Sequence, residues 1–266
     1  MSPRIAVAAT APFGADILER LAARHEISAL LTRPDARAGR GRTLAAPPAK
    51  QVAERLGIRM FQPERLEPGL DLHAPTVVAV AYGRIVPEDV LEERLWLNVH
   101  PSLLPLWRGA APVERALMAG DTETGVTIIR LVKELDAGPI AAQRAFAIDA
   151  DDDAGAVYAK AAPIAADLLD DVLPEPRYAP QLDAGATYAD KITAADRVLD
   201  LSRPPSDLVN QVRALSPHIG ARAELQGRPV TVWRARVDED GTFEPLEVQP
   251  DGGRRMEYAA WLRGLR

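Results

Sequence analysis

Three polar residues stand at the ends of predicted strands, where they could act on a carbonyl group. Asn98 and His100 lie two positions apart at the end of an apolar run, so their side chains project from the same face of a strand. Asp136 lies in a short Leu-Asp-Ala-Gly stretch between two further apolar runs. An amide can donate to an oxygen that gains charge, an imidazole can move a proton, and a carboxylate can orient the imidazole. The three residues together predict a site for acyl chemistry.

Each of these residues also has an ordinary structural explanation. A single histidine is often a buried structural residue, asparagine at a strand end often caps a turn, and aspartate before Ala-Gly is a common turn residue. Their spacing alone therefore leaves both interpretations open.

The composition is typical of a globular protein and excludes several kinds of chemistry. Of the 266 residues, 47% are hydrophobic and 26% are charged, with a net charge of −6. The chain has no cysteine, which excludes disulfides, thiolate metal sites, iron–sulfur clusters and a cysteine nucleophile. The other histidines, His25, His73 and His218, lack the spacing of metal ligands. The three aspartates at 151–153 precede a predicted helix, as capping residues do. We expect no metal.

Signals for a membrane or a nucleotide cofactor are missing from the sequence as well. The chain has no run of about 18 apolar residues and no basic and apolar leader at its start, so we expect a cytoplasmic protein. In the stretch that ends the first predicted strand, residues 8–14, Gly14 is the only glycine, whereas a dinucleotide fingerprint needs several. Neither a P-loop nor a Gly-x-Ser-x-Gly motif is present.

One short stretch is strongly basic although the whole chain is acidic. Residues 33–42 read RPDARAGRGR and contain one aspartate and four arginines: Arg33, Arg37, Arg40 and Arg42. A local basic cluster on an acidic protein indicates a specific anionic partner. A solvated, arginine-rich loop is the alternative interpretation.

Up to residue 173 the sequence alternates between strand-like and helix-like segments. We predict a doubly wound, mostly parallel, Rossmann-like α/β sheet. The expected strands cover residues 4–9, 27–32, 76–82, 95–100, 126–131 and 140–146, and the expected helices cover 15–24, 47–56, 112–119 and 154–173.

After residue 173 prolines and a glycine interrupt the periodicity, which is typical of a linker. Beyond it we predict a helix over 205–215, a hairpin that turns at Gln226-Gly227, a short strand at 246–249 and a helix over 256–262. These segments predict a small barrel. The expected organisation is a catalytic domain at 1–173, a linker at 174–202 and a C-terminal domain at 203–266.

Several motifs in this sequence resemble those of the methionyl-tRNA formyltransferase family. The residues from Asn98 to Pro105 (NVHPSLLP), followed by WRGAAP at 107–112, resemble the family signature. GVT at 125–127 with LDAG at 135–138 is similar to its second segment, and residues 33–42 are similar to its loop for the tRNA acceptor stem. Further similar segments follow in order along nearly the whole chain.

The resemblance implies an enzyme that moves the formyl group of 10-formyltetrahydrofolate to the amino group of methionine on initiator tRNA. It implies a formyltransferase domain followed by a small OB-like barrel, which here is shortened because few residues remain between Arg236 and Glu247. We expect a monomer that binds neither DNA nor a membrane. By position in the motifs, the catalytic residues are Asn98, His100 and Asp136, the folate is bordered by Ser102, Leu103, Leu104 and Pro105, and the tRNA is contacted by Arg33, Arg37, Arg40 and Arg42.

In the expected mechanism the amine attacks the formyl carbon. Asn98 and His100 donate to the oxygen of the tetrahedral intermediate, and Asp136 orients His100 and favours its charged form. Whether His100, Asp136 or water carries the proton from the amine to the folate nitrogen is left open.

The sequence departs from the family pattern in two loops. Ala9-Thr10-Ala11 stands where Gly-Thr-Pro is usual, and Leu106 stands where a basic residue is common. Two other functions are also considered, a sugar N-formyltransferase that acts on a nucleotide-linked amino sugar and a non-catalytic module that binds tRNA or folate. The arginine-rich stretch and the C-terminal module argue against the first, and the full catalytic set argues against the second.

Overall fold

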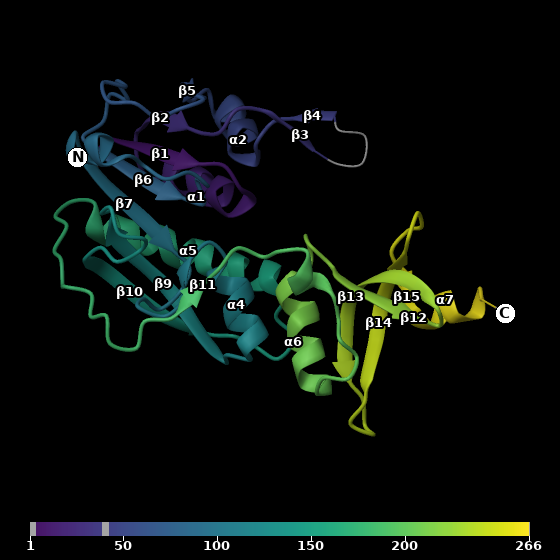
Figure 1. The fold of residues 1–266 in the computed structure, drawn as a ribbon. Helices are drawn as coiled ribbons and strands as arrows, with labels where there is room; N and C mark the ends of the chain where they lie inside the picture. Colours follow the sequence, from purple (N-terminus) through teal and green to yellow (C-terminus); the bar gives the residue numbers. More distant parts are fainter. Residues whose placement is uncertain (1–3, 39–42, 266) are drawn as a thin grey trace. The chain divides into compact units, whose positions relative to one another are not determined.

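The computed structural model of this protein describes residues 4–38 and 43–265. The chain divides into two compact units, and Figure 1 colours them along the sequence. Unit 1 comprises Met1–Arg108, Gly125–Ala145 and Ala159–Thr187, and unit 2 comprises Gly109–Thr124, Phe146–Tyr158 and Tyr188–Arg266. In the described part of the chain, no helix is both long and apolar enough to span a membrane.

Unit 1 is built on a mostly parallel sheet, as predicted. Its seven strands are arranged in the order β10-β9-β7-β6-β1-β2-β5. The strands from β7 to β5 in this order pair in parallel, and β9 runs antiparallel to β7. The bounds are β1 (Ile5–Ala9), β2 (Ile27–Leu31), β5 (Met60–Phe61), β6 (Thr76–Val80), β7 (Leu95–His100), β9 (Glu123–Arg130) and β10 (Ile140–Ala147).

Strand β1 is apolar throughout, as is typical of a strand in a sheet that is covered on both faces. On one face Ala6, Leu31 and Trp96 belong to one buried cluster. The alternate residues Ile5 and Val7 point to the other face and are also fully buried. Burying an aliphatic side chain of this size contributes about 1.5–3 kcal/mol, so these runs fold as strands wherever they can be covered on both sides.

Two helices of unit 1 begin at a proline. The helix predicted over 15–24 is α1 (Pro12–Ala22), and its first residue is a proline, which the first turn of a helix accepts because no backbone N–H is needed there. Helix α1 packs on β1 and β6. The other helices are α2 (Pro48–Leu56) and α3 (Glu88–Glu92), and two short antiparallel strands, β3 (Ala36–Ala38) and β4 (Thr43–Ala45), accompany the arginine-rich stretch.

The strand order reverses between β1 and β6, because the chain continues from β1 to β2 on one side and returns to β6 on the other. In open α/β sheets, ligands bind beyond the carboxyl ends of the strands at such a point. The loop after β1 is tied down there, since Thr10 Oγ1 donates to the carbonyl oxygen of Tyr82 at 2.8 Å. Gly14 lies so close to β6 that a Cβ would be 2.5 Å from Val80 O. This glycine therefore serves the packing of α1.

Unit 2 contains further helices and the C-terminal sheet. The two helices predicted over 112–119 and 205–215 are confirmed. Val113, Leu117, Val157 and Ala214 form one of its buried clusters. The helices are α4 (Pro112–Ala119), α6 (Pro205–Leu215), the 3₁₀ helix η1 (Ala195–Arg197) and α7 (Tyr258–Arg263); α5 (Ala154–Val172) contributes residues to both units, and β8 (Arg108–Gly109) and β11 (Tyr188–Ala189) are short strands.

The C-terminal sheet has four antiparallel strands in the order β12-β13-β14-β15. Its first hairpin turns at Gln226 and Gly227, as predicted, with φ angles of 51° and 68°. Two positive φ angles in a two-residue turn match the twist of the flanking strands. The strands are β12 (Ala221–Leu225), β13 (Arg228–Val237), β14 (Phe243–Pro250) and β15 (Met256–Glu257).

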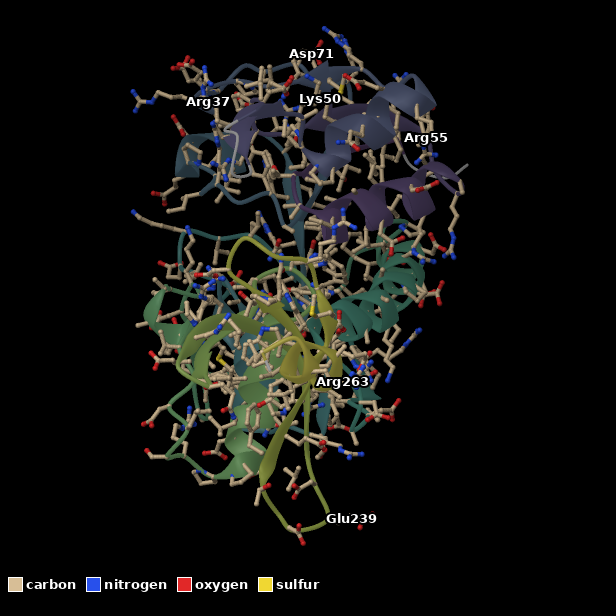
Figure 2. The ribbon with its side chains drawn as sticks, turned by 90° about the vertical axis from the view of Figure 1, so that its right-hand side faces the viewer. Arg37, Lys50, Arg55, Asp71, Glu239 and Arg263 are labelled. Carbon is tan, nitrogen blue, oxygen red and sulfur yellow. The ribbon has the colours of Figure 1, made fainter. Side chains whose placement is uncertain are left out.

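The predicted small, shortened barrel is this four-stranded sheet, with β12 and β15 at its edges. Val232, Val248 and Trp261 are buried in one cluster between the sheet and its helices, and Glu239 lies at the tip of the β13–β14 hairpin (Figure 2). The prediction of a helix from residue 256 is wrong at its start. Residues 256–257 pair with β14 as a strand, which satisfies their backbone groups before α7 begins.

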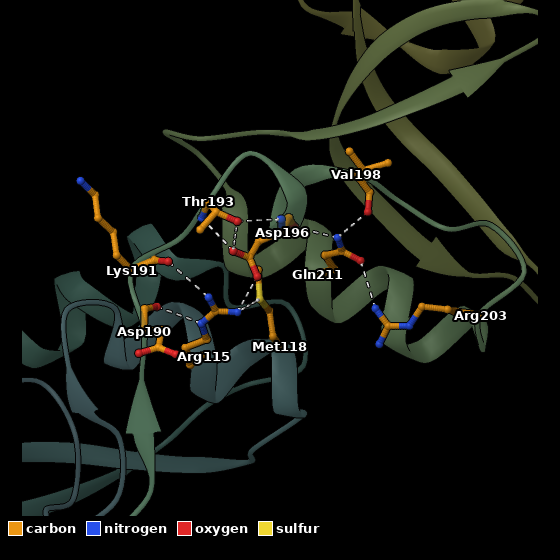
Figure 3. Close-up of polar contacts among 9 residues, drawn as sticks. All are labelled: Arg115, Met118, Asp190, Lys191, Thr193, Asp196, Val198, Arg203 and Gln211. Atoms are coloured by element: carbon orange, nitrogen blue, oxygen red, sulfur yellow. Dashed lines mark hydrogen bonds and ion pairs between the residues drawn. The ribbon is translucent and has the colours of Figure 1, made fainter.

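The second half of the predicted linker is docked on α4 and α6 (Figure 3). Arg115 on α4 donates to Asp190 O at 3.0 Å and to the Asp196 carboxylate at 2.7 Å. Gln211 on α6 donates to Asp196 O and Val198 O at 2.8 and 2.9 Å. The hydrogen bonds from Arg115 and Thr193 hold the pKa of Asp196 well below its usual range. This part of the connection has a defined path within unit 2.

We expect Gly14→Ala to destabilise the protein, because the new methyl group would overlap Val80 O and the Cβ of Ala9, which is only 2.8 Å away. Overpacking of this kind costs about 1–3 kcal/mol, to be measured as a lower urea midpoint. Gly264→Ala is the control, since its Cβ would meet nothing closer than 3.5 Å. Equal midpoints for the two variants would contradict the packing role.

Candidate active site

The structure brings the three polar residues together at one edge of the sheet in unit 1. Asn98 and His100 end strand β7, and Asp136 lies in the loop between β9 and β10. Asn98 Nδ2 is 3.4 Å from Asp136 Oδ1, and His100 Nδ1 is 3.6 Å from Asp136 Oδ2. The carboxylate thus stands between an amide and an imidazole, although it is separated from them by 38 and 36 positions in the chain.

The other nitrogen of His100 is held by the backbone. His100 Nε2 lies 2.8 Å from the carbonyl oxygen of Trp107. A carbonyl can only accept a hydrogen bond, so the proton of the neutral ring is on Nε2. Nδ1 therefore faces Asp136 without a proton and can accept one. The expected donation by His100 to the oxygen of the intermediate is at odds with this arrangement, because Nε2–H is already engaged.

Burial and charge shift the pKa of His100 in opposite directions. Its side chain is only 4% exposed, and burial lowers the pKa because a cation is poorly solvated there. The charge of Asp136 and the Trp107 carbonyl raise it, but burial has the larger effect, and the pKa lies below its usual value. Asp136 thus favours the charged form of His100, as expected, but burial outweighs this effect, and the imidazole of the free protein is neutral at neutral pH.

Two residues of the site have left-handed backbone conformations. Asp136 has a φ of 47° and Trp107 a φ of 63°. Residues other than glycine seldom adopt positive φ, and they keep it only where the surroundings hold them. In both cases the conformation aims a group at His100, the carboxylate of Asp136 and the carbonyl of Trp107.

The stretch expected to border the folate is partly buried. Ser102 and Leu104 are 0% and 3% exposed. The Ser102 hydroxyl donates to Leu106 O at 2.6 Å, and the backbone N–H of Leu104 donates to Thr127 Oγ1 at 3.2 Å. The side chains of Ser102 and Leu104 thus support the loop from inside.

The other two residues of this stretch are more accessible. Leu103 and Pro105 are partly exposed. Leu103 also packs over Gly125, where a Cβ would lie 2.3 Å from its Cδ2. From the folate-bordering set, only Leu103 and Pro105 have side chains that could meet a ligand.

Sequence reasoning missed two exposed apolar residues beside the site. Ile85, in the loop after β6, is 90% exposed, and Leu135, next to Asp136, is 62% exposed. Lys133, two residues before Leu135, forms an ion pair of 3.0 Å with Glu88, the first residue of α3, which follows the loop of Ile85. The missed signal was the apolar pair Ile-Val within Gly-Arg-Ile-Val-Pro at 83–87, in the loop that follows the strand over 76–80. Exposed apolar side chains on neighbouring loops are suited to a flat ring.

The arginine-rich stretch lies at the carboxyl end of β2 in unit 1. Arg33 is exposed, and a Cβ on Gly83 would be 3.7 Å from its Nη1. Arg37 is exposed on β3, and Figure 2 labels it together with Lys50. Arg40 and Arg42 lie outside the described residues.

The one aspartate of this stretch is neutralised by its neighbours. Lys50 Nζ lies 2.8 Å from the Asp35 carboxylate, and Gln62 donates to it at 3.0 Å. The hydrogen bonds from Gln62 and Lys50 lower the pKa of Asp35. Asp35 is thus paired with a lysine, and the arginines keep their net positive charge.

Comparison with known families supports the resemblance seen in the motifs. The family described as Formyl transferase matches residues 3–173, and Formyl transferase, C-terminal domain, matches residues 191–245. A methionyl-tRNA formyltransferase of Halorhodospira halophila is 41% identical over 304 aligned positions, which cover 100% of this chain and 97% of that protein. One of Paracoccus denitrificans is 38% identical and covers 98% of this chain and 97% of that protein.

Solved structures share the fold at lower sequence identity. A methionyl-tRNA formyltransferase from Clostridium thermocellum is 14% identical, with a TM-score of 0.65 over 96% of this chain and 99% of that chain. WlaRD, a sugar 3N-formyl transferase, is 14% identical, with a TM-score of 0.66 over 90% of this chain and 88% of that chain. These structures bear on the fold alone. The relatives that match the whole chain decide the family, and this chain belongs to the methionyl-tRNA formyltransferases.

Proposed function

We propose that this protein transfers the formyl group of 10-formyltetrahydrofolate to the amino group of methionine on initiator tRNA. The similarity of the whole chain to methionyl-tRNA formyltransferases carries this proposal. The grouping of Asn98, His100 and Asp136 at the carboxyl end of β7 supports it, because these side chains suit the chemistry. In the proposed organisation residues 1–173 form the catalytic domain, 174–202 the connection and 203–266 the C-terminal domain.

The reaction exchanges one carbon–nitrogen bond for another. The amine nitrogen attacks the formyl carbon, the carbonyl oxygen gains negative charge, and the bond from this carbon to the folate nitrogen then breaks. A proton leaves the amine and one reaches the folate nitrogen. The chain must therefore stabilise an oxyanion and move a proton.

Asn98 is the donor best placed for the oxyanion. Asn98 is partly exposed, and its Nδ2 contacts Asp136 Oδ1 at 3.4 Å. A hydrogen bond this long is weak, so the amide is available to an oxygen that develops charge nearby. Asp136 at the same time keeps the amide oriented.

His100 is the proton carrier in this proposal. Its Nδ1 has no proton in the neutral ring, so it can accept one from the attacking amine. The resulting imidazolium is stabilised on both sides, by the Asp136 carboxylate and by the Trp107 carbonyl. His100 then returns the proton to the departing folate nitrogen.

For the folate, we propose that the pteridine ring packs between the loops that carry Ile85 and Leu135. Both side chains are exposed and apolar, and both loops border the edge where Asp136 lies. Leu103 and Pro105 complete the apolar border, while Ser102 and Leu104 hold that loop from inside.

For the tRNA, we propose that Arg33, Arg37, Arg40 and Arg42 bind phosphates. The planar guanidinium group can make two hydrogen bonds to one phosphate. Because Lys50 neutralises Asp35, the stretch presents its positive charge to an anionic partner.

The function is tested by incubating the protein with labelled 10-formyltetrahydrofolate and two acceptors, methionyl-initiator tRNA and a nucleotide-linked amino sugar. We expect label on the tRNA alone. Label on the sugar would replace the proposal with sugar N-formylation, and label on neither would indicate a binding module.

Asn98→Ala should lower kcat by about 100- to 1,000-fold, the usual loss when one oxyanion donor is removed. The melting temperature should change little, because the removed hydrogen bond is long. Gln51→Ala, which removes an exposed amide on α2, is the matched control and should keep full activity. A kcat within about threefold of the unchanged protein would remove Asn98 from the mechanism.

The lowered pKa of His100 predicts a pH dependence of stability. Below about pH 6.5 the unfolded chain binds a proton on this residue, whereas the folded chain does so only at lower pH. The free energy of unfolding should therefore fall on acidification from pH 7.5 to 5.5. In His100→Asn this decrease in the free energy of unfolding should be absent. Urea midpoints at the two pH values measure the difference between the variant and the unchanged protein. If the free energy of unfolding of His100→Asn falls with pH as steeply as that of the unchanged protein, the lowered pKa of His100 is contradicted.

Arg33→Ala and Arg40→Ala should each raise the KM for tRNA by about tenfold or more, as expected for a hydrogen bond between charged groups worth about 1.5–3 kcal/mol. The slope of log(kcat/KM) against log salt should decrease by about one for each lost phosphate contact. The KM for the folate should stay unchanged. Arg55→Ala is the control, because Arg55 is exposed on α2 and paired with Glu19 (Figure 2). An equal effect of all three substitutions would argue against a defined phosphate site.

A further inference from the structure

A segment outside the sequence motifs contacts both loops that surround His100. Residues 179–187 belong to unit 1 and follow the proline-containing stretch after α5. We infer that Gln181 and Thr187 in this segment are positioning residues for formyl transfer, which hold the left-handed backbones of Asp136 and Trp107. The inference rests on the function proposed above for the same site.

Gln181 clamps the loop that carries Asp136. Its Nε2 donates to Asp136 O at 3.0 Å and to Gly138 O at 2.9 Å. The loop is tight at this point, because a Cβ on Gly138 would lie 1.8 Å from Arg130 O. One amide group therefore fixes two carbonyls of a turn whose first residue has a φ of 47°. That conformation directs the Asp136 carboxylate.

The other end of the Gln181 amide is fixed by a buried arginine. Its Oε1 accepts from Arg108 Nε at 2.7 Å, and Arg108 is 4% exposed. A guanidinium group only donates and a carbonyl only accepts, so only one orientation of the amide satisfies all three contacts. Arg108 Nη1 is in turn paired with Asp183 at 2.9 Å. Gln181 thus links the Asp136 loop to the residue that follows Trp107.

Thr187 holds the backbone of Trp107, as Gln181 holds that of Asp136. The backbone N–H of Trp107 donates to Thr187 Oγ1 at 2.8 Å, and the N–H of Arg108 donates to Thr187 O at 2.9 Å. These contacts hold a residue with a φ of 63° whose carbonyl accepts from His100 Nε2. Thr187 therefore acts through Trp107 on the position of the proton on His100.

Residues 179–187 are held by hydrogen bonds at both ends, and the middle of the segment is exposed. Ile140 and Ala179 exchange two backbone hydrogen bonds of 2.8 and 2.9 Å, which tie its start to β10. Residues 182–185 between the two contacts are exposed, Leu182 to 73%. Packing thus explains little of this path, whereas the hydrogen bonds of Gln181 and Thr187 go to the loops of Asp136 and Trp107.

Loss of these contacts should affect the chemical step more than binding. Gln181→Glu keeps the shape and the acceptor for Arg108 but places an oxygen against two carbonyl oxygens. The Asp136 loop must then shift, and misplacement of a catalytic group by about 1 Å can cost a hundredfold in rate. We expect kcat to fall by about tenfold or more, with KM for tRNA and folate within about twofold.

The matched control is Asp183→Asn, which weakens the partner of Arg108 but touches neither the Asp136 loop nor Trp107. It should keep kcat near that of the unchanged protein. Thr187→Val retains the shape of threonine and removes the acceptor for the Trp107 N–H, and it serves as the second variant if Gln181→Glu fails to fold. It should also lower kcat.

The decisive measurement is the protonation of His100, which requires no substrate. With ¹⁵N-labelled histidine the chain gives signals from 4 residues, and His100→Asn identifies that of His100. The unchanged protein should show the proton on Nε2, and Thr187→Val should show a mixture of the two tautomers. For Gln181→Glu we expect a shifted acid limb in the pH dependence of kcat.

Three results would overturn the inference. The first is an unchanged His100 tautomer in Thr187→Val, and the second is an unchanged acid limb of the pH dependence of kcat in Gln181→Glu. The third is that both variants have the kcat of Asp183→Asn and only a lower melting temperature. If the unchanged protein formylates neither acceptor, the proposed function fails, while the tautomer measurement still decides whether Thr187 positions His100.

Discussion

The hydrogen bond from His100 Nε2 to the carbonyl oxygen of Trp107 is the contact on which the candidate site depends. Because a carbonyl only accepts, the bond puts the proton on Nε2 and leaves Nδ1 to face Asp136. It also requires Trp107 to keep a positive φ, which an isolated chain would rarely adopt. The loop from residue 101 to 108, and the segment that holds it through Thr187, therefore fix the orientation of His100.

Burial decides whether the His100 imidazole beside the Asp136 carboxylate is charged. A histidine beside a carboxylate in water would be easier to protonate, but here the loss of solvent outweighs the carboxylate and lowers the pKa of His100. The imidazole is neutral at rest and can act as a base. Once it holds a proton, the same low-dielectric surroundings strengthen its attraction to Asp136. A buried pair of this kind stays effective only if its geometry is kept, which explains the need for positioning contacts such as those of Gln181.

Much of the fold could be predicted because it depends on local pattern. The strand over 95–100 and the helices over 112–119 and 205–215 have the predicted limits, since apolar alternation, apolar runs and proline in the first helical turn are properties of neighbouring residues. Two of the strands that were not predicted, β5 and β15, have two residues each. Their conformation is decided by pairing with β2 and β14, which lie elsewhere in the chain, and no local signal reveals it.

The candidate site shows the same difference between properties set by neighbouring residues and properties set by contacts across the fold. The sequence by itself determined which groups are available, an amide, an imidazole and a carboxylate at the ends of strands, and its motifs identified the family. Only the tertiary structure decided that Ser102 and Leu104 are buried, that Ile85 and Leu135 are exposed beside the site, and which nitrogen of His100 faces Asp136. The physical reason is that exposure, pKa and tautomer depend on contacts between residues far apart in the chain, such as Asp136 with Gln181 and Trp107 with Thr187.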